Sequence, residues 1–145
     1  MIIYAEISSC LDHDFTGGEK MRFSQYIITF FMGFFLYSLV EIVGRGYTHW
    51  TMSLTGGIIF SALYAINSCK GITLIRSCFV GALLITAVEF AVGIFDNIIM
   101  RWEVWDYSEL PLNFMGQICL FFSLYWYILC IPAYYLCRLL RKRFG

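Results

Sequence analysis

Four long apolar stretches constrain this chain more than any other feature. They cover about residues 23–43, 52–66, 72–95 and 117–137, so we expect no second, soluble domain. A helix that crosses a lipid bilayer needs roughly 20 mostly apolar residues. Barrel strands alternate polar and apolar residues, and these stretches do not. We therefore expect an all-α, polytopic membrane protein, with a bundle of four transmembrane helices formed by residues 23–145.

The composition agrees with this reading. Only 14% of the residues are charged and 60% are hydrophobic, whereas soluble domains have about 25% charged residues. Most of the protein surface must therefore face something apolar, and the lipid bilayer is the expected partner. The formal net charge is zero, so the charge gives no reason to expect binding to nucleic acid.

The basic residues are unevenly distributed between the two sides of such a bundle. Four spans place Arg45 and Arg101 on one side and the other eight on the opposite side. Lysine and arginine accumulate in cytoplasmic loops. We therefore predict that the N and C termini are both cytoplasmic. The eight residues of the predicted cytoplasmic set are Lys20, Arg22, Lys70, Arg76, Arg138, Arg141, Lys142 and Arg143.

Residues 1–22 form a polar N-terminal tail without the features of a signal peptide. The segment Gly17-Gly18-Glu19-Lys20 directly precedes Met21. A purine-rich stretch of the kind that serves as a bacterial ribosome-binding site can encode those four residues. We hypothesise that Met21 is the true start of the protein. The alternative is an ordinary disordered tail.

Two glutamates within the apolar stretches, Glu41 and Glu89, are the most informative polar residues. A carboxylate at the centre of a membrane helix is costly, so each should face the protein interior and have a partner. Arg45 and His49 lie on the same predicted side. The loop predicted over residues 96–116, which begins with Asp96, supplies further polar groups. The candidate ligand or ion site comprises Glu41, Arg45, His49, Glu89, Trp105, Asp106, Tyr107, Asn113 and Gln117. A polar network that only clamps the loop, and a catalytic site, remain alternatives.

Several chemical signatures are missing from the sequence. It contains no G-x-x-x-x-G-K-[ST], H-E-x-x-H or G-x-S-x-G motif. After the N-terminal tail, His49 is the single histidine, which excludes a histidine-rich metal site. We therefore assign no catalytic residue, metal or cofactor. Tyr125, Trp126 and Tyr127 are interpreted as a packed aromatic face.

Three motifs before the last apolar stretch point to a family. They are Trp105-Asp106-Tyr107-Ser108, then Pro111-Leu112-Asn113-Phe114, then Gly116-Gln117-Ile118-Cys119-Leu120. In this order they resemble the bacterial putative ABC-transporter type IV membrane protein family. Glu41, with the segment from Gly44 to Met52 and with Gly56-Gly57, is similar to one branch of it. Glu89 fits the glutamate in the family's third span, and the resemblance covers about residues 25–140.

This resemblance implies a multi-pass protein of the bacterial plasma membrane. We expect a small transporter, a channel or a permease-like subunit with a polar site near the outer leaflet. Four spans are few for a transport pathway, so a homo-oligomer or a partner membrane subunit is expected. One alternative is a non-transporting interaction protein such as a sensor, an immunity factor or an assembly factor. Another is an intramembrane enzyme acting on a lipid-like substrate.

Overall fold

The computed structural model describes residues 23–69 and 71–144, and the predicted tail and the Met21 start lie outside them. The fold is all-α, as the sequence predicts, apart from one short antiparallel pair of strands. In chain order the elements are α2 (Phe23–Arg45), α3 (Trp50–Ser68), α4 (Leu74–Gly93), the π-helix η1 (Ile94–Ile99), β1 (Asn113–Phe114), β2 (Ile118–Cys119) and α5 (Leu120–Phe144).

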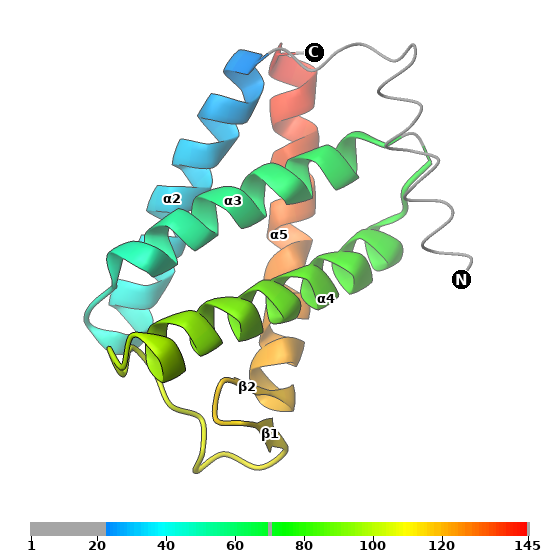
Figure 1. Cartoon of the computed structure of the whole chain (residues 1–145). Coiled ribbons are helices and arrows are strands. Elements are labelled where there is room, and N and C mark those ends of the chain that lie inside the picture. Colours follow the sequence, from blue (N-terminus) through cyan, green and yellow to red (C-terminus); the bar gives the residue numbers. More distant parts are fainter. Residues whose placement is uncertain (1–22, 70, 145) are drawn as a thin grey trace.

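The helix α2 packs against α3, α4 crosses and packs against α5, and α3 also contacts α4 and α5 (Figure 1). The start of α2 and the end of α5 lie at the same end of the bundle. The side-chain amide of Gln25 donates a hydrogen bond of 2.8 Å to the backbone oxygen of Phe144 there. The loop over residues 100–119 and the connection from α2 to α3 lie at the opposite end. That second end carries the polar residues of interest.

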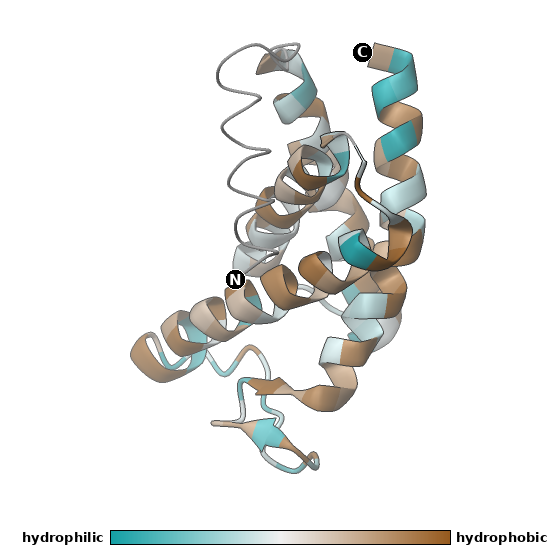
Figure 2. Ribbon diagram, turned by 90° about the vertical axis from the view of Figure 1, so that its right-hand side faces the viewer, coloured by the Kyte–Doolittle hydropathy of each residue, from teal (hydrophilic) through white to brown (hydrophobic). Residues whose placement is uncertain are grey.

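Within residues 23–69 and 71–144, three helical segments are long and apolar enough to cross a membrane: Phe23–Arg45, Leu74–Ile99 and Leu120–Phe144. Large apolar side chains are exposed along all three. A surface of this kind is suited to lipid rather than to water. Figure 2 shows apolar ribbon along the helices, with hydrophilic residues at the C-terminal end of α5 and in the loop that precedes it. The chain is therefore a multi-pass membrane protein.

The helix α3 differs from the other three in its burial. It is not among the segments that meet the length and hydropathy requirement for a span. Twelve of its 19 residues are buried, whereas α2 buries only Gln25, Thr29 and Gly33. Because α3 contacts all the other helices, its weakly apolar residues face protein.

The last helix differs from the predicted stretch of residues 117–137. It begins at Leu120 and continues through Pro132 to Phe144. The helix therefore does not end at this proline. Proline removes one backbone hydrogen bond, a loss that membrane helices tolerate where neighbouring groups compensate. Residues 118–119 instead form β2, which pairs with β1 at the edge of the loop.

One apolar cluster fixes the loop to the bundle. Met52 of α3 packs with Val104 and Trp105 of the loop, and all three are at most 6% exposed. Their burial holds the following loop residues against the ends of α4 and α5.

Candidate functional site

Glu89 is a buried carboxylate that accepts hydrogen bonds from uncharged donors. It lies in α4 and is 4% exposed. The indole Nε1–H of Trp126 in α5 donates a hydrogen bond of 2.8 Å to its Oε2 atom. The phenol of Tyr107 in the loop donates one of 3.2 Å to its Oε1 atom. Within residues 23–69 and 71–144, no lysine, arginine or histidine forms an ion pair with Glu89.

Aromatic rings surround this carboxylate. Tyr37 of α2 stacks on Trp126 with a centroid distance of 5.8 Å, and Tyr107 stacks on Phe122 at 4.6 Å. Burial, and to a smaller extent the nearby Glu89 carboxylate, raises the pKa of Tyr107 well above its ordinary value. The phenol therefore keeps its proton and remains a donor. The loop, α2 and α5 all contribute rings to this aromatic enclosure.

A second carboxylate, Glu41 in α2, is paired with Arg45 one turn later. One guanidinium nitrogen of Arg45 lies 2.7 Å from both Glu41 oxygens. The other terminal nitrogen donates a hydrogen bond of 3.0 Å to the backbone oxygen of Val104. The pair therefore ties the end of α2 to the loop. Arg45 Nε is buried and has no hydrogen-bond partner in the described part of the chain.

A third polar cluster consists of His49, Thr51 and Asp96, and it connects a half-buried histidine to a buried aspartate. His49 Nδ1 lies 2.7 Å from Thr51 Oγ1, and the Thr51 hydroxyl donates a hydrogen bond of 2.6 Å to Asp96 Oδ2. Asp96 is fully buried, at 0% exposure. We expected Asp96 at the start of the loop, but it lies in η1, which extends α4. π-Helical turns are rare and are frequently found at functional sites.

A network of amides clamps the loop onto the helix ends. Asn97 Nδ2 donates to the Trp105 backbone oxygen at 2.9 Å and to Gln117 Oε1 at 2.8 Å. Asn97 Oδ1 accepts a hydrogen bond of 2.7 Å from the Val104 amide. The Trp105 indole donates one of 3.0 Å to the Gln117 backbone oxygen. These contacts satisfy the hydrogen bonds of polar groups that the loop buries. Such contacts are expected of a polar network that only clamps the loop.

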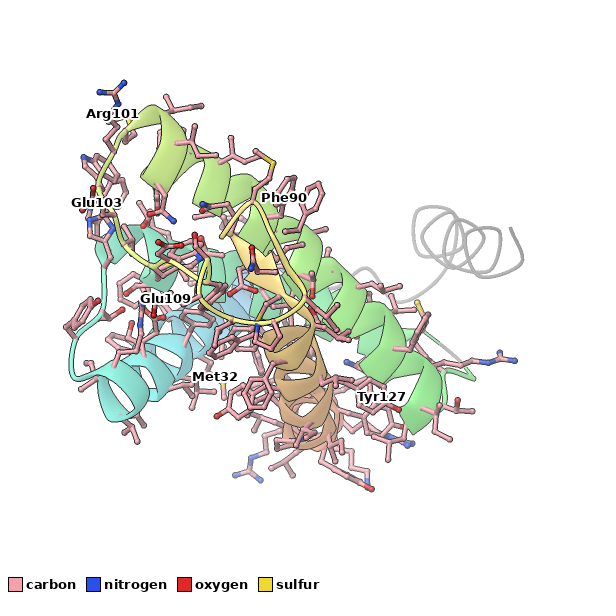
Figure 3. The ribbon with its side chains drawn as sticks, turned by 90° about the horizontal axis from the view of Figure 1, so that it is seen from below. Met32, Phe90, Arg101, Glu103, Glu109 and Tyr127 are labelled. Atoms are coloured by element: carbon pink, nitrogen blue, oxygen red, sulfur yellow. The ribbon has the colours of Figure 1, made fainter. Side chains whose placement is uncertain are left out.

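Two of the nine candidate residues form hydrogen bonds only with nearby residues of the loop, within the described part of the chain. Asp106 is exposed and accepts hydrogen bonds from the Ser108 hydroxyl and from the Ser108 amide, the latter at 2.8 Å. Asn113 donates to the backbone oxygens of Ser108 and Leu110 and accepts from the Gly116 amide. Figure 3 shows the loop across the end of the bundle, with Arg101 pointing away from it.

Ser108→Ala tests the role of Asp106 in the loop. The Ser108 hydroxyl, followed by its backbone amide, holds the pKa of the Asp106 carboxyl below its ordinary value. Removing the hydroxyl should raise that pKa toward the ordinary range. A lowered pKa stabilises the fold above the carboxyl's unfolded pKa and ceases to do so as pH falls through the folded value. A carbon-13 NMR titration of Asp106 measures the shift; an unchanged pKa would contradict the assignment.

The structure therefore brings together seven of the nine candidates, in neighbouring clusters at one end of the bundle. They are Glu41, Arg45, His49, Glu89, Trp105, Tyr107 and Gln117. Their partners lie outside the nine candidates and are Tyr37, Thr51, Asp96, Asn97 and Trp126. Helical spacing on its own gives no sign that a given threonine or tryptophan meets a carboxylate of another helix.

The comparisons with known proteins agree with this architecture. A family model described as "Putative ABC-transporter type IV" matches residues 26–144, which is most of the chain. The chain belongs to this family. No curated protein and no solved structure matches it at a significant level. Membership confirms the resemblance found in the sequence and makes the chain a transporter-related membrane protein.

Membership in the ABC-transporter type IV family does not assign the buried carboxylates a role. The matched segment includes all seven clustered residues. Their roles therefore have to be argued from their contacts.

Proposed function

We propose that this chain is a small transporter, channel or permease-like subunit of the bacterial plasma membrane, with its polar site around Glu89. The observation that carries the proposal is a buried carboxylate held by uncharged donors alone. Charged groups inside membrane proteins are costly, and they commonly mark pathways for ions or substrates. A carboxylate without a paired cation can bind a cation or a protonated ligand.

The proposal includes the topology. The distribution of lysine and arginine favours cytoplasmic N and C termini, with the loop over residues 100–119 near the outer leaflet. The helix α3 then completes the bundle as a fourth span. It needs less apolar surface than the others because the other helices cover it.

We also propose that the loop controls access to Glu89 and that several protomers assemble. Tyr107 bonds directly to Glu89, so a ligand would reach the carboxylate when the loop moves. One protomer offers few helices to enclose a pathway, which favours a homo-oligomer.

Ion flux through reconstituted protein tests this function. The full-length chain in liposomes should release trapped protons, Na⁺ or K⁺ faster than empty liposomes. Glu89→Gln keeps the size of the side chain and removes its charge, so the folded variant should lose that flux. Glu109→Gln, at an exposed position of the loop, is the matched control and should retain it.

Two results would count against the proposal. One is a wild-type chain that stays monomeric and gives no flux above the empty liposomes. The other is a folded Glu89→Gln variant with wild-type flux, which would favour a structural role in an interaction protein.

A further inference from the structure

We propose that His49, Thr51 and Asp96 form a proton relay that loads a buried carboxylate from the end of the bundle. The relay is separate from the contacts of Glu89, and it can operate whether or not the chain transports anything. Three observations carry the inference: the continuity of the hydrogen bonds, the complete burial of Asp96 and an unpartnered oxygen on that carboxylate.

The hydrogen bonds are short and continuous. Nδ1 of His49, the hydroxyl of Thr51 and Oδ2 of Asp96 are linked by distances of 2.7 and 2.6 Å. Thr51 has one hydroxyl proton, which it donates to Asp96. His49 Nδ1 must therefore carry the proton of the other bond. This arrangement leaves Nε2 as the histidine atom that can accept a proton.

The two ends of the relay differ in their access to solvent. His49 is half-buried, and its Nε2 has no hydrogen-bond partner and is not a fully buried atom within the described residues. Asp96 is 0% exposed, and its Oδ1 is buried without a partner. The hydroxyl of Thr51 thus connects an accessible base to an inaccessible one.

The transfer balances without any further reactant. A proton from solvent binds Nε2 of His49, and the Nδ1 proton moves to the oxygen of Thr51. The original Thr51 hydroxyl proton moves to Oδ2 of Asp96. His49 ends neutral with its proton on Nε2, and Asp96 ends as the neutral acid. The hydrogen bonds are then reversed, because Asp96 donates to Thr51 and Thr51 donates to Nδ1.

Charged groups on neighbouring elements leave this route open. Within the described residues, neither His49 nor Asp96 forms an ion pair. Arg45 is paired with Glu41, and Glu89 is bonded to Tyr107 and Trp126. Arg101 and Glu103 of the loop are exposed, and both lie at its outer edge in Figure 3. The rings that flank His49 are those of Trp50 and Trp102, at 5.8 and 5.2 Å.

Time-resolved infrared spectroscopy after a pH jump tests the relay in the full-length chain in liposomes. Acidification should produce a protonated-carboxyl band that Asp96→Asn removes. Thr51→Val should slow the appearance of this band by about 100-fold or more, because positioned proton-transfer groups contribute effects of that size. Thr51→Ser, which retains a hydroxyl, should restore the rate.

The matched control is Thr55→Val, one turn further along α3. The Thr55 hydroxyl donates to the backbone oxygen of Thr51 and takes no part in the relay. The band should therefore appear in the Thr55→Val variant at the same rate as in the wild type. If Thr51→Val does not fold, His49→Gln provides the same test and should slow the band. A wild type without an Asp96 band, or a folded Thr51→Val or His49→Gln variant with wild-type kinetics, would overturn the proposal.

Discussion

Gly33→Ala is expected to destabilise the protein, whereas Gly44→Ala in the same helix is not. A methyl group on Gly33 would overlap the backbone oxygen of Gly56 and the Cβ atom of Phe60. Neither atom is the end of a flexible side chain, so α2 would have to move away from α3. Overpacking of this kind costs about 1–3 kcal/mol, and sometimes more.

The control works because it makes the same chemical change without the contact. A methyl group on Gly44 would meet nothing within 4 Å. Alanine also has a higher helix propensity than glycine, by up to about 1 kcal/mol. In mixed micelles, the two variants should therefore change the free energy of unfolding in opposite directions or by unequal amounts. Equal shifts for the two variants would show that α2 and α3 do not pack at Gly33.

Trp126→Phe should have the second large effect, because it leaves Glu89 with one of its two donors missing. A buried acceptor without its partner costs about 1–3 kcal/mol, and a charged one costs more. The smaller ring also leaves a cavity beside Tyr37. We expect a lower free energy of unfolding in micelles, and a greater loss than for Trp102→Phe, because Trp102 is 39% exposed.

A double-mutant cycle separates the hydrogen bond from the cavity. The cost of Trp126→Phe should be smaller in a Glu89→Leu background, which has no carboxylate to leave unpaired. The difference measures the coupling between the indole and the carboxylate. A coupling near zero would contradict the hydrogen bond and weaken the case for an enclosed site.

The sequence was sufficient to predict the helical segments because hydropathy is a local property. In lipid, the backbone N–H and C=O groups of each apolar stretch must form hydrogen bonds within that stretch. The position of each helix can therefore be predicted without knowledge of its neighbours. The exceptions have tertiary causes. The helix α3 is less apolar because protein covers it, and Asp96 continues a helix although a charged residue usually signals a loop.

The candidate site was only partly predictable. Glu41 and Arg45 pair at helical spacing, which a sequence reveals. Glu89 was identified because a carboxylate is rare inside an apolar stretch. Its donors come from a loop and from another helix, Tyr107 and Trp126, and no sequence rule links them to it.

The sequence by itself determined that this chain is an all-α, multi-pass membrane protein of the ABC-transporter type IV family. Only the tertiary structure decided which polar groups meet. It separated Asp106 and Asn113 from the buried carboxylates and joined Asp96 to His49 through Thr51. The physical reason is the range of the interactions. Partition into lipid acts on each stretch independently, whereas a hydrogen bond requires two atoms within about 3 Å of each other, and the packing of the helices sets that distance.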